Sequence, residues 1–142
     1  MFHNVGVHSS PQPTALEDLP NIDIILISHD HYDHLDITSL QQLTEKYQPV
    51  ILAGLGVKQR LESTAMNMLV ELDWWQEYIF SKELGITFVP SRNNSGRGLF
   101  DENKTLWGGF VIKGSAGDVL FMGDTALGGF LKEIKRAFPV FV

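Results

Sequence analysis

The chain has 142 residues, 44% hydrophobic and 20% charged, which is typical of one folded domain and argues against a disordered protein. Its formal net charge is −6 and no run of Lys or Arg forms a patch, which argues against a nucleic acid or an anionic membrane as the main partner. The absence of cysteine excludes disulfides and thiolate metal sites. Because we find no signal-peptide pattern and no apolar stretch of membrane-spanning length, we expect a cytoplasmic protein without a transmembrane segment.

The first predicted elements are a strand and a helix that enclose a polar segment. Residues 1–21 contain three prolines and form an irregular lead-in, with a short helical turn expected at its end, from Thr14 to Asp18. The β-branched run Ile22–Ile27 predicts a buried strand. After the polar residues 28–34, Asp36 is placed to cap a helix over 37–47, where apolar residues recur at helical spacing.

The rest of the chain continues the alternation of strands and helices. We expect strands at Val50–Ala53, Met68–Leu72, Ile86–Val89, Thr105–Lys113 and Val119–Met122, and helices at Val57–Ser63 and Phe130–Phe138. Residues 91–104 are expected to form a polar loop, and residues 114–117 a turn between the last two strands. This order predicts a single α/β layered domain over residues 1–142, with a mixed sheet.

The polar segment after the first strand carries the strongest chemical signal. Five potential metal ligands fall within six residues: His29, Asp30, His31, Asp33 and His34. So many imidazoles and carboxylates at the end of a buried strand would repel one another or lack partners unless a cation binds them. Imidazole suits Zn²⁺, and carboxylate suits harder ions such as Mn²⁺. The alternative is a solvated polar loop, against which the density of histidines argues.

The spacing and a second segment extend this prediction. Side chains alternate in direction along an extended loop, so His29 and His31 are expected to serve one ion, and Asp33 and His34 a second. Asp124 follows a short apolar strand and a glycine, where its carboxylate can reach a site at the edge of the sheet. Asp124 could also cap the next helix, and the two roles can coexist.

Several motifs resemble those of the metallo-β-lactamase superfamily, in the branch of the N-acyl-phosphatidylethanolamine-hydrolysing phospholipases D and the ascorbate-6-phosphate lactonases. They are SHDHYDHLD at 28–36, ELDWW at 71–75, SGR at 95–97, LWGG at 106–109 and GDT at 123–125. They occur in the family's order, and the resemblance as a whole spans about residues 14 to 138. The resemblance implies an αββα sandwich with a dinuclear metal site at one edge.

The resemblance also implies ligands and a reaction. The implied metal ligands are His29 and His31 for the first ion, Asp33 and His34 for the second, and Asp124 for both. Zinc is the first expectation and manganese the alternative. The reaction implied is hydrolysis of a phosphodiester or a related ester, in a small-molecule or lipid-like substrate, by a metal-bound hydroxide. Asp33 would be the catalytic residue that orients the hydroxide and passes its proton to the leaving group. Arg97 is a candidate for binding the substrate phosphate.

Two departures from the family pattern bear on activity. Asn93 stands where the family has a histidine, so the resemblance makes it a weak sixth ligand and predicts partial metal occupancy. The family also has strands at both ends and a last histidine ligand that this chain lacks, so we expect an incomplete fold with two ligands missing. An inactive remnant that works as an oligomeric metal- or ligand-binding module is therefore the alternative to a hydrolase. Apolar residues at 138–142 predict a homo-oligomer, in which elements could be exchanged.

Overall fold

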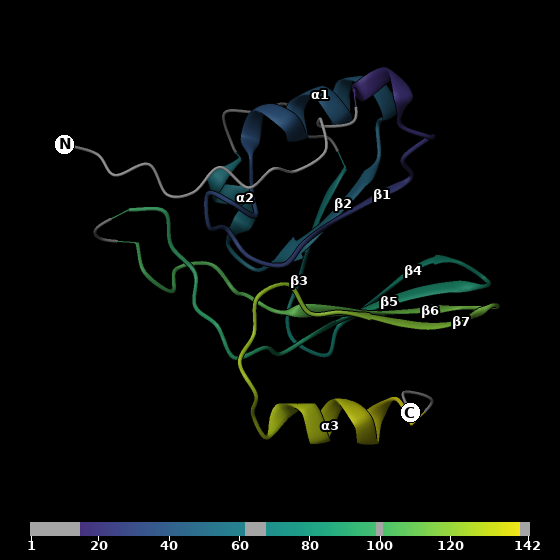
Figure 1. Ribbon diagram of the computed structural model, residues 1–142, viewed down its shortest axis with the longest axis vertical. Coiled ribbons are helices and arrows are strands. Elements are labelled where there is room, and N and C mark those ends of the chain that lie inside the picture. Colours follow the sequence, from purple (N-terminus) through teal and green to yellow (C-terminus); the bar gives the residue numbers. More distant parts are fainter. Residues whose placement is uncertain (1–14, 62–67, 99–100, 140–142) are drawn as a thin grey trace.

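Two sheets lie face to face in the computed structural model, with helices on the outer side of each (Figure 1). The structure describes residues 15–61, 68–98 and 101–139. The parallel sheet has the order β1 (Ile24–Ile27), β2 (Val50–Gly54), β3 (Leu69–Leu72). The antiparallel sheet has the order β4 (Glu77–Ser81), β5 (Leu84–Val89), β6 (Gly109–Gly114), β7 (Gly117–Phe121). The helices are η1 (Leu16–Asp18), α1 (Ile37–Tyr47), α2 (Val57–Arg60) and α3 (Phe130–Ala137).

Strand β2 shows how the layers are held together. Its side chains alternate between the two faces of the sheet: Ile51 packs in a cluster with residues of α1 and α2, whereas Leu52 packs in a cluster with Phe88 and Phe110 of the other sheet. The rings of Phe88 and Phe110 lie 5.0 Å apart between the sheets. A third cluster joins the antiparallel sheet to α3 through Ile134. The order of layers is therefore helix, sheet, sheet, helix, as the predicted αββα fold requires.

Helix α1 has the predicted bounds because its signals are local. The side chain of Asp36 accepts a hydrogen bond from the backbone N–H of Ser39 at 2.6 Å, which caps the first turn. Leu40 is buried against the parallel sheet. At the other end Gln48 adopts a left-handed conformation and donates its N–H to the carbonyl of Thr44. Only Leu35 and Asp36 therefore separate the polar segment that follows β1 from the first residue of the helix.

Most expected elements are present, with several differences in extent. Parallel and antiparallel pairings both occur, but in two separate sheets instead of one mixed sheet. Strand β4 was not expected, because most of its side chains are exposed and show no alternation. The strand expected from Thr105 begins only at Gly109. Before that point the backbone bonds to loops: Leu106 donates to Leu55, and Gly108 donates to Ser28.

Several expectations fall partly outside the described residues. The lead-in over 1–21 and the helical turn expected from Thr14 are described only from residue 15, and the loop expected over 91–104 includes residues 99–100, which lie outside the described ranges. The helix expected over Val57–Ser63 is observed as Val57–Arg60, with Leu61 as its C-cap, and residues 62–63 lie outside the described part. The apolar end expected at 138–142 is described only in part: Phe138 lies beside the last turn of α3 and is buried against the antiparallel sheet. Phe138 is therefore part of the core and not an exposed apolar residue available to another chain.

Candidate metal centre

The loop between β1 and α1 lies beside the loop that follows β7. The carbonyl of Ser28, the first residue after β1, accepts a hydrogen bond at 2.9 Å from Gly108, just before β6. Gly123 and Asp124 follow β7, the strand paired with β6. The sheets thereby bring two loops together that are far apart in the sequence, at one edge of the sandwich.

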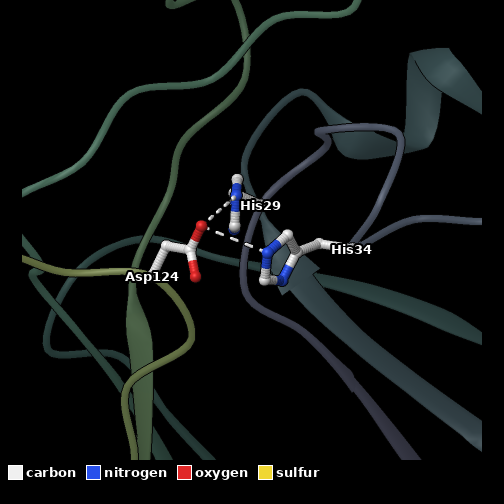
Figure 2. A group of neighbouring side chains, drawn as sticks. All are labelled: His29, His34 and Asp124. Carbon is white, nitrogen blue, oxygen red and sulfur yellow. Dashed lines mark ion pairs between the residues drawn. The ribbon is translucent and has the colours of Figure 1, made fainter. Parts of the chain in front are cut away.

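Three predicted ligands meet where these loops approach each other (Figure 2). Oδ2 of Asp124 lies 3.2 Å from Nε2 of His34 and 4.0 Å from Nε2 of His29. One ligand atom from each of the three residues lies within 4.8 Å of the others. His29 is 1% exposed, whereas Asp124 is 56% exposed. The group is therefore buried on the side of β1 and open to solvent on the side of Asp124.

The chemistry of His29 fits a metal ligand. Burial lowers its pKa, and the neighbouring rings of His34 and His31 lower it further, so the neutral imidazole is favoured at neutral pH. Nδ1 lies 3.0 Å from Oγ of Ser28, and Nε2 is buried without a hydrogen-bond partner among the described residues. With its proton on Nδ1, the ring donates to Ser28 and directs the lone pair of Nε2 toward Asp124. A divalent cation would satisfy this otherwise unpaired nitrogen.

The other two predicted ligands of the loop lie beside this group. The ring of His31 meets that of His29 edge-on at 4.5 Å between centroids. Asp33 is 79% exposed, and its Oδ2 lies 3.6 Å from Nε2 of His34. His29 and His34 have centroids 4.2 Å apart, so the structure groups two histidines that the sequence assigned to different ions. Which ion each residue binds stays a prediction.

Asn93 lies in a segment that is hydrogen-bonded to the loop of Asp124. The N–H of Arg92 donates to Oγ1 of Thr125 at 3.0 Å, and the carbonyl of Arg92 accepts from Ala126 at 3.1 Å. Nδ2 of Asn93 is buried without a hydrogen-bond partner among the described residues. Its role as a weak metal ligand, through the amide oxygen, stays a prediction.

Arg97 contacts the ligand loop. Its Nη1 donates to the carbonyls of Asp30 and Leu35, at 3.0 and 2.7 Å, and its guanidinium carbon lies 4.0 Å from the centre of the Tyr32 ring. Binding of a substrate phosphate by Arg97 stays a prediction. Asp30 is fully buried and takes no part in the group around Asp124, because it pairs with Arg60.

Sequence reasoning missed the contact between Ser28 and Gly123. Gly123 has φ of +59°, and a Cβ there would lie 2.5 Å from both Cβ and Oγ of Ser28. The two loops can approach this closely only because residue 123 has no side chain. The Gly-Asp pair after a strand was the available signal, but its partner could not be identified without the fold.

This fold and this cluster of imidazoles and carboxylate define a metallo-β-lactamase-type domain. A family model described as "Beta-lactamase superfamily domain" matches residues 4–140, so the chain belongs to that superfamily. The expected family and fold are thereby confirmed.

Relatives and a solved structure share this domain. The chain is 35% identical over 126 residues to the mitochondrial N-acyl-phosphatidylethanolamine-hydrolyzing phospholipase D of Saccharomyces cerevisiae, covering 86% of this chain and 26% of the relative. It is also 35% identical over 125 residues to the N-acyl-phosphatidylethanolamine-hydrolyzing phospholipase D 1 of Caenorhabditis elegans, covering 81% of this chain and 35% of the relative. The metallo hydrolase Igni18 from Ignicoccus hospitalis has the same fold, with a TM-score of 0.70 at 19% identity, covering 87% of this chain and 52% of that one. The chain thus spans about a quarter to a third of the two phospholipases.

No helix in the described ranges is long and apolar enough to cross a membrane. The cytoplasmic location stays a prediction.

Proposed function

We propose that this chain is the metal-binding part of a hydrolase that uses divalent cations to cleave a phosphodiester or related ester, with zinc as the first candidate for the metal. The observation that carries the proposal is the buried, unpartnered Nε2 of His29, which faces Asp124 beside His34. The names of the two phospholipases support a lipid-like phosphoester as the substrate class.

The residues around the cluster have distinct parts in this chemistry. A divalent cation held by His29, His34 and Asp124 would polarise the scissile group and lower the pKa of a bound water toward neutrality. Asp33 lies on the open side, beside His34, where it can accept a proton and pass it to the leaving group. His31, whose ring packs against that of His29, would complete the proposed ligand set.

An open pocket beside the ligand loop offers room for substrate. It has a volume of about 580 Å³ and is lined by His31, Tyr32, Asp33, Gly96, Arg97 and Gly98. The lining therefore combines proposed metal ligands with Arg97. A phosphate bound there would lie close to both.

Metal content is the first test. Protein purified without chelators is expected to hold at least about one zinc ion per chain, measured by plasma mass spectrometry. His34→Ala and Asp124→Ala are expected to reduce this content, whereas Glu77→Gln, on β4, leaves it unchanged. Less than about half an ion per wild-type chain would contradict the proposal.

The second test asks whether Asn93 limits activity. Asn93→His supplies the imidazole that the family pattern places there, so zinc content and turnover of bis(4-nitrophenyl) phosphate are both expected to rise. Asn94→His adds the same ring at the exposed neighbouring position and is expected to change neither. Zinc binding without turnover, in the wild type and in Asn93→His alike, would favour the inactive metal-binding module. Self-association as a homo-oligomer remains a prediction, which sedimentation equilibrium would check.

A further inference from the structure

We propose that four charged residues behind the ligand loop act as positioning residues for the metal centre. The four are Asp30, Arg60, Arg97 and Asp101, which we call the Asp30 network. The proposal rests on the metal-binding function proposed above, and it concerns how the ligands are held before a metal binds.

Asp30 anchors the ligand loop from inside. It lies between two proposed ligands in the sequence, yet it is 0% exposed. Its Oδ2 accepts from Nε of Arg60 at 3.1 Å, and its Oδ1 accepts from the N–H of Gly96 at 2.7 Å. A buried carboxylate is tolerated only when it is paired and hydrogen-bonded, so these contacts fix the side of the loop opposite the ligands.

Arg97 holds the same loop by its backbone. The carbonyls of Asp30 and Leu35, which accept from its Nη1, lie on either side of the segment 31–34. The N–H groups of His34 and Leu35 both donate to the carbonyl of His31, at 3.0 and 2.9 Å, and close a turn over this segment. One guanidinium nitrogen therefore ties both ends of the turn that carries three of the proposed ligands.

Asp101 connects the two arginines. Its Oδ1 accepts from the N–H groups of Arg97 and Gly98, at 3.1 and 2.7 Å, and its Oδ2 lies 2.8 Å from Nη2 of Arg60. Two arginines and two aspartates make the network neutral overall. It therefore adds no net charge beside the metal centre, and we expect it to act through the geometry of the loop.

The test compares loop protection with metal affinity in Arg97→Ala. In the metal-free protein the amides of His34 and Leu35 are expected to exchange hydrogen for deuterium faster than in the wild type, while amides of β5 and β6 keep their rates. The affinity for zinc, measured by chelator competition, is expected to fall about 10- to 100-fold. Neither readout involves substrate, so a role of Arg97 in binding phosphate would not change them.

Glu77→Gln is the matched control, because it breaks the exposed ion pair between Glu77 and Lys113, 3.3 Å long, on the antiparallel sheet. It should change neither readout. Asp101→Asn is the milder second variant: it keeps an oxygen that can accept from the backbone but loses the charge that faces Arg60. Asp101→Asn is expected to speed exchange at His34 and Leu35 and to lower the zinc affinity, both less than Arg97→Ala does. If Arg97→Ala does not fold, Asp101→Asn decides the result.

Unchanged exchange at His34 and Leu35 in a folded variant would overturn the proposal, as would faster exchange throughout β5 and β6. Faster exchange at the two amides with unchanged zinc affinity would also overturn it. Failure of the wild type to bind zinc would instead contradict the proposed function, and the exchange rates would then still show whether the network holds the loop.

Discussion

The two loops of the metal centre can meet because Gly123 has no side chain. The left-handed conformation of Gly123 places its Cα against Ser28, whose Oγ lies 3.0 Å from Nδ1 of His29. Asp124 is the next residue, so its position depends on this contact. The distance between Asp124 and His29 is thus set by two residues that bind no metal.

Gly123→Ala is expected to damage both stability and metal binding. The positive φ should cost about 1–3 kcal/mol of the free energy of unfolding, and the clash with Ser28 should move Asp124 and weaken zinc binding. Gly117→Ala is the control, because φ there is +125° but nothing lies within 4 Å of the added methyl. It should lose stability and keep zinc affinity. Urea unfolding and chelator competition measure the two effects, and equal zinc affinity in both variants would contradict the argument.

The carboxylate of Asp101 should make stability depend on pH. The hydrogen bond from the backbone of Gly98 lowers the pKa of Asp101 below its usual 3.8, and the amide of Arg97 and the charge of Arg60 lower it further. Because the pKa is lower in the folded state, this stabilisation is present above pH 3.8 and is lost as the pH falls through the folded pKa.

Asp101→Asn cannot ionise and lacks this contribution. The difference in Tm between wild type and variant should therefore be largest near about pH 6 and shrink toward about pH 3, as followed by circular dichroism. A difference that stays constant over this range would show that the charge of Asp101 does not stabilise the fold.

At the scale of elements, α1 fixes the end of the ligand loop. The cap at Asp36 and the buried Leu40 hold the first turns of the helix against the parallel sheet. These signals lie within a few residues of one another, which is why the bounds of α1 could be predicted. Strand β4 lacks such a signal, since it is an edge strand whose side chains face mainly solvent.

Leu40→Ala tests how much the packing of α1 contributes. Leu40 is 4% exposed, so its truncation is expected to lower the free energy of unfolding by about 2–5 kcal/mol. Gln41→Ala, on the exposed face of the same helix, should stay within about 0.5 kcal/mol of the wild type. Urea unfolding followed by tryptophan fluorescence provides both values, and similar losses in the two variants would be evidence against this packing.

At the scale of the molecule, the sandwich joins ligands from both ends of the described chain. His29 follows the first strand of the parallel sheet, and Asp124 follows the last strand of the antiparallel sheet. A cation bound to both would connect the two sheets, so metal binding and the stability of the whole fold should be linked.

Zinc is therefore expected to raise the Tm of the wild type. At a free concentration of about 100 times Kd, binding adds about 2.7 kcal/mol, which corresponds to a rise of about 5–10 °C for a chain of this size. His34→Ala should lose most of this rise, and a chelator should reverse it in the wild type. Differential scanning calorimetry gives the values; an unchanged wild-type Tm would contradict a structural link through the metal.

The sequence by itself determined the features that neighbouring residues encode. The strand β1, the dense ligand loop and the capped helix α1 follow from local apolar spacing, capping and ligand chemistry, and the ordered motifs indicated the superfamily. The ordered motifs also implied that Asp124 joins the ligand loop. Only the tertiary structure decided that His29 lies beside His34, and that Asp30 turns away to pair with Arg60. These contacts depend on how two sheets pack and on partners distant in the chain, for which spacing within a short segment holds no information.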